Sequence, residues 1–488
     1  MPKVFQKLLL WMTIVLGVLG VSYLLLPTMG MAIALAGLTA AVSGTIIYGE
    51  ERLPLVVGGL VLLLAGGVTD FHHLIEGMEW VLFIKLVGLL TWVDFLNHSD
   101  YFDYLIEKYL PRQFQGFSLI AILLVLSSFS AALIDEVNSV VLMYAVMRAI
   151  IGFTKKGVFK LSKASWLVLV ILLVSATNIG SQFLPLGNPV GIAISVISGL
   201  TALDFIKFTW VPGLLTLGYF LVRVRFGYQK LLRDFQTVTV EKEDFEVLDE
   251  IREQYEVVET EDPVSTQESH VVAGNPIPIK ILHWLFGAGL VGLLIASPLS
   301  GLLGIDPANG MGIFVMILFA VTLFIGSNYK KHNEVLLSQL PWTTLFFIIF
   351  LFGIAHGLEV TGVTDVIAEQ LFVMFGANQI LLRLVIVIVA AVVTAIMDNV
   401  IAIAVVAPVI LALGDKGLET TGLWFTLLTV AVVAGNLTPI GSAANIIANA
   451  RIRASWGQWW QTAGVLALEC LAINVVALYV WELLIAKI

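Results

Sequence analysis

The sequence has 488 residues, of which 59% are hydrophobic and only 12% are charged, and its mean hydropathy is +0.97. Soluble domains carry about 25% charged residues, so this composition excludes an ordinary soluble protein and indicates a polytopic membrane protein. The formal net charge is −9, from 26 basic and 35 acidic residues, which argues against a nucleic-acid partner.

Apolar runs of nearly bilayer-spanning length recur along the whole chain. The first follows Lys3 and Lys7, and no small-residue cleavage site lies between Tyr23 and Pro27, so we expect a retained first helix rather than a signal peptide. A helix needs about 20 residues to cross a bilayer. The runs are 8–26, 28–48, 162–177, 281–297, 311–326, 342–355, 380–397 and 462–480.

The stretch "SSFSAALIDEVNSVVLMYAV" (127–146) places two acids within an apolar segment. An ionised carboxylate at the bilayer centre costs at least about 2.5–3.5 kcal/mol, so Asp135 should face the protein interior and have partners. Asn138 and Ser139 follow it and are candidate ligand groups, whereas the sequence gives Glu136 no clear role.

The next polar stretch is "ATNIGSQFLPLGNPVGI" (176–192). Glycine weakens a helix and proline removes a backbone donor, so this stretch predicts an interrupted helix or a re-entrant hairpin. Such backbone is tolerated at membrane depth only where protein or a water-filled cavity satisfies it. Asn178, Ser181, Gln182 and Asn188 are therefore candidate site residues.

A long acidic segment then divides the chain. It contains "KEDFEVLDEIREQYEVVETEDPVSTQESH" (242–270) and separates two apolar halves of nearly equal length. The sequence thus predicts a first membrane half at 1–227, a solvated linker at 228–279 and a second membrane half at 280–488.

The second half contains the same two kinds of polar stretch. "VVTAIMDNVIAIAVVAPVI" (392–410) holds Asp398 and Asn399. "AGNLTPIGSAANIIANA" (434–450) combines glycine, proline and small polar residues, and its candidate site residues are Asn436, Thr438, Ser442 and Asn445.

The two halves repeat each other. Trp80 lies 262 residues before Trp342, and Asp135 lies 263 residues before Asp398. "LPLGNPVG" (184–191) lies 254 residues before "TPIGSAAN" (438–445), so the second half has a shorter connection. An offset held over so many residues indicates a duplicated structural unit.

The charged loops indicate that the repeat is inverted. "TKKGVFKLSK" (154–163) follows the first acidic helix, whereas "GDKGLET" (414–420), with two acids and one lysine, follows its counterpart. Lysine-rich loops stay cytoplasmic, so equivalent loops lie on opposite sides. We expect the N-terminus and the linker to be cytoplasmic. Inverted repeats are typical of secondary transporters with one central site.

Three interpretations of Asp135 and Asp398 remain open at this stage. They could bind sodium, which prefers carboxylate and carbonyl oxygens, or carry protons, or cap the half-helix that follows them. The other conspicuous residues have simpler interpretations: Arg383 as a snorkelling side chain, Trp456, Trp459 and Trp460 as an interfacial belt, and Cys470 as a lone buried thiol.

With these motifs the sequence resembles the ion-transporter superfamily of arsenite-efflux permeases, citrate and other carboxylate transporters, and certain sodium/proton antiporters. The resemblance rests on "SAALIDEVNSVV", "TAIMDNVIAIAVVAPV", "NIGSQFLPLGNPVGI" and "GNLTPIGSAANIIA", and covers residues 50–225 and 280–485. It implies re-entrant hairpins with tips near residues 135–139 and 398–401, unwound helices near 180–188 and 435–445, and a substrate between the tips. It also implies homodimerisation.

The sequence departs from the dicarboxylate branch of that superfamily, which has Ser-Asn-Thr at both hairpin tips. Here the tips read Asp-Glu-Val-Asn-Ser and Asp-Asn-Val, with Glu136 where asparagine is usual. This favours an arsenite-type or broader anion permease over a sodium-coupled dicarboxylate carrier. The paired acids keep cation/proton antiport as the alternative.

The sequence therefore predicts an all-α polytopic membrane protein with two inverted repeats of about five to six segments each, working by alternating access. We expect a secondary active transporter of a small ion in a prokaryotic plasma membrane, coupled to H⁺ or Na⁺, with sodium held near Asp135 and Asp398. No cofactor is expected, and no His-Glu-x-x-His or nucleophile motif suggests an enzyme.

Overall fold

The structure is a computed structural model in which every described segment is helix, turn or connection. It describes residues 3–48, 53–99, 101, 104, 116–152, 162–235, 277–303, 307–329, 333–338, 340–397 and 399–485. Within these ranges nine helices are long and apolar enough to cross a membrane. The prediction of an all-α polytopic membrane protein is confirmed. Asp398 and the acidic linker between residues 236 and 276 lie outside the described residues.

Within its described residues the first half contributes ten helical elements after the N-terminal helix α1 (Lys3–Leu25). They are α2 (Met29–Tyr48), α3 (Leu53–Ala65), α4 (Phe71–Gly77), α5 (Trp80–His98), α7 (Phe117–Ile134), α8 (Glu136–Gly152), α9 (Lys163–Gly180), the short 3₁₀ turn η1 (Pro185–Gly187), α10 (Pro189–Ser198) and α11 (Ala202–Gly227). A short helix, α12 (Gln229–Phe235), follows at the start of the linker.

The second half follows the same order. Its described elements are α14 (Ile279–Leu302), α15 (Pro307–Tyr329), α16 (Asn333–Ser338), α17 (Trp342–Val360), α18 (Val363–Phe375), α19 (Gln379–Ile396), α20 (Asn399–Asp415), α21 (Thr421–Ala434), the 3₁₀ turn η4 (Gly435–Leu437), α22 (Ala443–Ile452), α23 (Trp456–Trp459), the short π-helix η5 (Trp460–Gly464) and α24 (Val465–Ile485).

Equivalent helices match in length and spacing. α5 and α17 each have 19 residues and begin 262 residues apart, and α7 and α19 each have 18 residues at the same offset. α10 and α22 each have ten residues and begin 254 residues apart. The order and lengths of the helices are thus compatible with the repeat predicted from the sequence, which stays a prediction.

The packing between the halves is reciprocal. α3 packs on α17 while α15 packs on α5, and α10 packs on α20 and α21 while α22 packs on α8 and α9. α11 and α24, the last long helices of the two halves, pack on each other. A pseudo-twofold relation between the halves requires such pairings. The opposite orientation of the halves across the bilayer stays a prediction.

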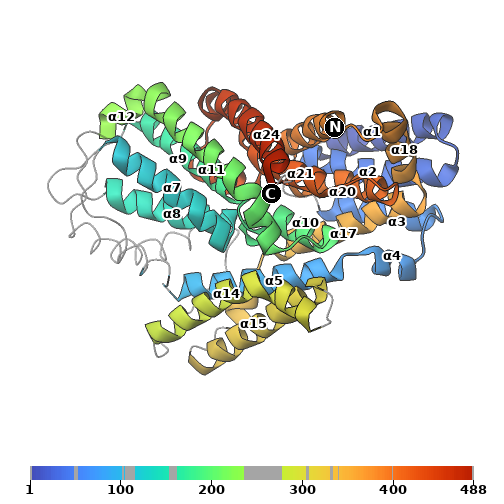
Figure 1. Cartoon of the computed structure of the whole chain (residues 1–488). Coiled ribbons are helices and arrows are strands. Elements are labelled where there is room, and N and C mark those ends of the chain that lie inside the picture. Colours follow the sequence, from blue (N-terminus) through green and yellow to red (C-terminus); the bar gives the residue numbers. More distant parts are fainter. Residues whose placement is uncertain are drawn as a thin grey trace.

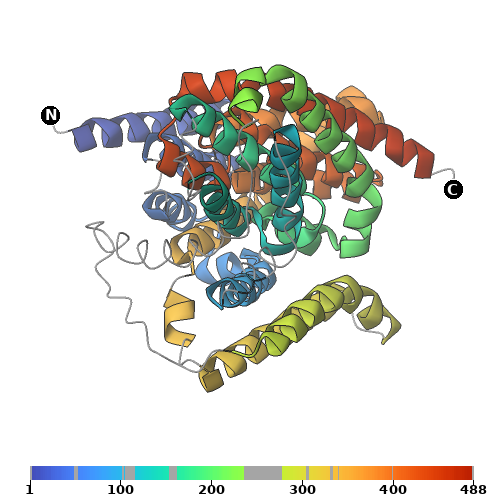
Figure 2. The ribbon, with the colours of Figure 1, turned by 90° about the vertical axis from the view of Figure 1, so that its left-hand side faces the viewer.

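The helices form a central group and two flanking groups (Figure 1). α7, α8, α9 and α12 lie at one end, α1, α2, α3 and α18 lie at the other, and α10, α20, α21 and α24 lie between them. α14 and α15 form a hairpin along one edge beside α5 (Figure 2). α9 and α21 are buried along most of their lengths, which explains why they are apolar on all sides.

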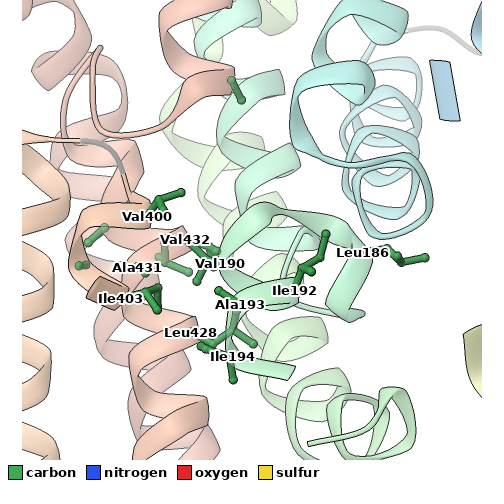
Figure 3. Packing of buried hydrophobic residues seen from close by; sticks show 14 of the residues in the cluster. Leu186, Val190, Ile192, Ala193, Ile194, Val400, Ile403, Leu428, Ala431 and Val432 are labelled. Atoms are coloured by element: carbon green, nitrogen blue, oxygen red, sulfur yellow. The ribbon is translucent and has the colours of Figure 1, made fainter. Parts of the chain in front are cut away.

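The central group is held by close packing of small and branched side chains (Figure 3). Val190 and Ala193 of α10 face Ile403 of α20 and Leu428 and Ala431 of α21, and all five are buried. Lipid tails are as apolar as these side chains, so helix association in a bilayer depends on such packing and on interhelical hydrogen bonds. Alanines let the backbones approach.

The interpretation of Arg383 as a snorkelling side chain is wrong. Arg383 of α19 is 6% exposed and donates from Nη1 to Oε1 of Glu482 in α24, at 3.2 Å. A second bond joins its Nη2 to Oε2 of the same carboxylate, and Nη1 also reaches the Thr426 hydroxyl of α21 at 3.4 Å. Arg383 therefore links α19, α21 and α24 in the interior, and its partner acid lies 99 residues further along the chain.

Replacing Arg383 alone should destabilise the protein strongly. In Arg383→Met the carboxylate of Glu482 loses its counter-charge, which costs about 3–5 kcal/mol for a buried pair. We expect a clearly lower melting temperature in detergent. The double variant Arg383→Met/Glu482→Leu should recover most of the loss, because well-packed apolar residues often replace a buried pair at little cost. A double variant no more stable than the single one would contradict this account.

Candidate functional site between the two halves

The first hairpin turns at a strained, capping aspartate. Asp135 lies between α7 and α8 with φ 68° and ψ 165°, a region that is almost restricted to glycine and costs on the order of 1–3 kcal/mol. Its Oδ1 accepts from the backbone N–H groups of Val137 (2.5 Å) and Asn138 (3.3 Å), and its Oδ2 accepts from the Asn138 amide (2.8 Å). Asp135 therefore caps α8. Its predicted role in ion binding stays a prediction.

Serines fasten this hairpin tip to α9. Ser139 donates to the carbonyl oxygen of Ser127 at 3.0 Å, and its hydroxyl lies 2.6 Å from that of Ser130. Ser127 bonds in turn to the Thr177 hydroxyl (2.5 Å), and Ser128 donates to the carbonyl oxygen of Ala176 (2.9 Å). The tip and the break at the end of α9 thus form one unit.

The break after α9 is folded on itself by Asn188. Its Nδ2 donates to the carbonyl oxygen (2.9 Å) and hydroxyl (3.0 Å) of Ser181, and its Oδ1 accepts from the backbone of Gly191 at the start of α10 (2.7 Å). Asn188 is therefore the N-cap of α10, and Pro189 occupies the first helical position, where its missing N–H costs nothing.

Gly180 marks where this break packs against the hairpin. A Cβ added there would lie 1.9 Å from the backbone oxygen of Ser128, which cannot move without shifting α7. Overpacking typically costs about 1–3 kcal/mol, so we expect Gly180→Ala to lower the melting temperature and transport. The control is Gly218→Ala: this α11 residue has nothing within 4 Å and should gain up to about 1 kcal/mol from helix propensity. Equal effects of the two variants would show that Gly180 is not a packing contact.

The two breaks meet at the centre of the molecule. Asn178, fully buried, donates from Nδ2 toward three oxygens of the second half: Oδ1 of Asn436 (2.7 Å), Oδ1 of Asn445 (3.0 Å) and Oγ of Ser442 (3.2 Å). The Nδ2 of Asn445 donates to the carbonyl oxygens of Gly435 and Thr438, each at 2.8 Å. We call Asn178, Asn436, Ser442 and Asn445 the asparagine cluster.

The hairpin tips also meet. Nδ2 of Asn399, the first residue of α20, lies 3.5 Å from Oε1 of Glu136, the first residue of α8. Both are 1% exposed, and they occupy matching places in the repeat, as Asn178 and Asn436 do. Residues equivalent in the two halves thus contact each other twice, which supports a pseudo-twofold axis through this region.

The remaining predicted residues lie around these contacts. The amide of Gln182 accepts from Thr429 of α21 (3.2 Å) and from Asn474 of α24 (3.1 Å), and Thr438 donates to the carbonyl oxygen of Ala395 in α19 (2.7 Å). The structure therefore joins Asn178, Asn436, Ser442 and Asn445 directly, places Gln182 and Thr438 in bonds to other helices, and keeps the bonds of Asp135, Asn138, Ser139, Ser181 and Asn188 within the first half.

Two site residues were missed or misread in the sequence. Asn474 is a buried amide in an otherwise apolar run, and the rule applied to Asp398 would have found it. Trp459 is fully buried and donates from its indole N–H to the carbonyl oxygen of Asn436 (2.9 Å), so its assignment to an interfacial belt is wrong. Its neighbours Trp456 and Trp460 are exposed and keep that interpretation.

A buried polar centre, built from broken helices of two packed halves in an all-helical membrane protein, defines a membrane transporter. The family model described as "Citrate transporter" matches residues 46–427 and again residues 314–487. The chain belongs to this citrate transporter family, and its resemblance to the ion-transporter superfamily is confirmed.

Individual relatives agree with this class. An uncharacterized transporter of Mycobacterium bovis is 26% identical over 421 residues, covering 84% of this chain and 88% of that protein. An uncharacterized transporter of Mycobacterium tuberculosis is 24% identical over 465 residues, covering 92% and 98%. The human P protein is 23% identical over 471 residues, covering 85% of this chain and 54% of its own length.

Proposed function

We propose that this protein is a secondary active transporter that carries a small anion, with a carboxylate such as citrate as the first candidate, by alternating access. The observation that carries the proposal is the asparagine cluster, in which the broken helices of both halves bond to each other inside the membrane-spanning bundle. Membership in the citrate transporter family supports the choice of a carboxylate.

The chemistry of the two breaks suits an anion. α10 and α22 both begin at these breaks, with the side chains of Asn188 and Ser442 as their N-caps. Helix N-termini present free backbone N–H groups and the positive end of the helix dipole, and interrupted helices in transporters aim these ends at anionic substrate groups. Amides and hydroxyls can exchange their present mutual bonds for bonds to a carboxylate.

The acids at the tips would supply the coupling. Accumulation of an anion inside a negatively charged cell must be coupled to another ion gradient. For this role we propose H⁺ or Na⁺, bound at Asp135 and at its counterpart Asp398. The same acids carry the alternative function, sodium/proton antiport. An arsenite-type substrate is the second anion to test.

The test uses proteoliposomes with a trapped pH dye and labelled citrate. We expect citrate to accumulate inside the liposomes above its external concentration when a proton or sodium gradient is imposed. Without a gradient, the internal concentration should reach the external one and rise no further. Arsenite and alkali cations are added in separate arms. Proton efflux driven by sodium or lithium alone, without anion uptake, would replace the proposal by the antiporter.

A further inference from the structure

One buried acid near the asparagine cluster has no role in the function described so far. Glu136 is the first residue of α8, is 1% exposed, and accepts a hydrogen bond from the Asn399 amide of the second half at 3.5 Å. An ionisable side chain inside a membrane protein is expensive and by default marks a functional site. Glu136 is therefore a candidate for direct recognition of the substrate.

The first turn of α8, which begins with Glu136, lies beside the last turn of α9. The Ser139 hydroxyl in this turn donates to the carbonyl oxygen of Ser127 at 3.0 Å. The hydroxyl of Ser127 lies in turn 2.5 Å from that of Thr177. Thr177 directly precedes Asn178 near the end of α9, and Asn178 belongs to the asparagine cluster. The start of α8 and the cluster are therefore joined by a short chain of bonds.

The start of α22 lies beside the same part of α9. Asn445, in the first turn of α22, accepts from the Asn178 amide at 3.0 Å. Further along, α8 and α22 pack on each other, and the guanidinium group of Arg451 lies 4.9 Å from the ring centroid of Tyr144. The helices α8 and α22 therefore run in the same direction from the end of α9, and Glu136 begins α8 close to the asparagine cluster.

The asparagine cluster and Glu136 set different requirements for one substrate. Amides, hydroxyls and helix N-termini suit a carboxylate group. A glutamate carboxylate accepts hydrogen bonds and repels a second negative charge nearby, and this repulsion is stronger away from water. An anion beside Glu136 is favoured when the group that it directs toward this acid donates a hydrogen bond.

A hydroxyl group meets this requirement. Hydrogen bonds from a hydroxyl to a carboxylate are charge-assisted, and they are about twice as strong as those between neutral groups. The Asn399 amide carries two N–H donors, so it can bond to Glu136 and to the oxygen of the same hydroxyl group. The contact between the hairpin tips thus offers both an acceptor and a donor to a hydroxyl group.

We propose that Glu136 recognises a hydroxyl group of the substrate, and that the transported anions are therefore hydroxycarboxylates. In this arrangement the asparagine cluster binds a carboxylate group, while Glu136 and Asn399 bind the hydroxyl group. At the matching place the second tip carries the neutral Asn399, so the two tips differ in the group that they offer. The inference rests on the proposed function and adds the substrate class to it.

The test compares compounds that differ only in a hydroxyl group. Citrate is paired with tricarballylate and malate with succinate, at a pH at which all their carboxyl groups are ionised. Each compound competes with labelled citrate for uptake into proteoliposomes. We expect the wild type to bind the hydroxyl-bearing member of each pair about 10- to 100-fold more tightly, which is the range for one hydrogen bond to a charged group.

Variants of Glu136 assign this preference to its carboxylate. Glu136→Gln keeps the side-chain size and should reduce the preference to a few-fold, partly by raising the affinity for tricarballylate and succinate, because the repulsion is gone. A merely structural role would lower the affinities for both members of each pair alike. Glu136→Asn is the second variant, in case the first does not fold, and should act in the same way. The control is Glu76→Gln, the same change at an exposed glutamate of α4, which should leave all affinities unchanged.

Two outcomes would overturn the inference and leave the proposed function in place. The first is equal affinity of the wild type for the two members of each pair, a measurement that needs no variant. The second is an undiminished preference in folded Glu136→Gln, because another group would then bind the hydroxyl. If the wild type takes up none of these carboxylates, the proposed function itself is overturned, and the inference with it.

Discussion

Asp135→Asn should leave the protein folded and reduce coupled transport by about 10- to 100-fold. A hydrogen bond or ion contact to a charged group contributes about 1.5–3 kcal/mol, and each 1.4 kcal/mol is a factor of ten in an equilibrium constant. Removing the charge from the proposed coupling site therefore lowers ion occupancy by this factor. The measurement is gradient-driven uptake in proteoliposomes, beside the melting temperature in detergent.

Asp135→Asn separates the two roles of this side chain, the N-cap of α8 and the negative charge. The Oδ1 of an asparagine can still accept from the backbone N–H groups of Val137 and Asn138, as Asp135 does now. The backbone at φ 68° and ψ 165° is unfavourable for aspartate and asparagine alike, so the substitution leaves the cost of this turn nearly unchanged. Helix α8 keeps its N-cap while the carboxylate is lost.

The matched control is Asp204→Asn. Asp204 is another acid at the N-terminal end of a helix in the first half, where it completes a capping box with Thr201 at the start of α11. We expect it to change stability by a few tenths of a kcal/mol and to leave uptake unchanged. If Asp135→Asn and Asp398→Asn each kept wild-type uptake, both acids would act only as helix caps. The proposed coupling site would then be wrong.

Much of the fold could be predicted from the sequence because a bilayer imposes simple constraints. Apolar runs of spanning length, and polar or helix-breaking residues inside them, are both visible in one sequence. The equivalence of Trp80 and Trp342 and of the two Pro-aliphatic-Gly breaks then indicated a repeat, and α5 and α17 begin at those two tryptophans.

The sequence could not predict which polar residues pair with one another. Arg383 and Glu482 lie in different apolar runs, and nothing local indicates that α19 and α24 place them together. Trp459 looked interfacial because Trp456 and Trp460 flank it, but a helix turns its residues to different sides, and Trp459 is the one directed to the Asn436 carbonyl. Pairings of this kind depend on packing between distant segments.

The sequence also could not predict that equivalent residues of the two halves touch. Asn178 and Asn436 were candidates by residue type alone, and their contact follows from the reciprocal packing of α22 on α9 and α10 on α21. Because this contact joins the two halves, replacing Asn178 should disturb the broken helices of both halves.

Asn178→Leu should therefore destabilise the protein and abolish transport together. Leucine has a similar size but no donor, so the Oδ1 atoms of Asn436 and Asn445 would lose the Asn178 amide, at a cost on the order of 1–3 kcal/mol for each. The control is Asn328→Leu in α15, where the amide is exposed and donates to the carbonyl oxygen of Phe324 one turn earlier. We expect a markedly lower melting temperature for Asn178→Leu alone.

Asn178→Asp separates the loss of stability from the loss of transport. The substitution keeps the side-chain size but places a carboxylate beside the oxygens of Asn436, Ser442 and Asn445. The new negative charge repels these oxygens and also an incoming anion. If the asparagine cluster recognises an anion, the affinity for citrate should fall in the fraction of Asn178→Asp protein that remains folded. A cationic substrate should bind this variant more tightly than the wild type. Unchanged citrate affinity in a folded Asn178→Asp protein would place the anion elsewhere, because a new negative charge at the binding site must oppose it.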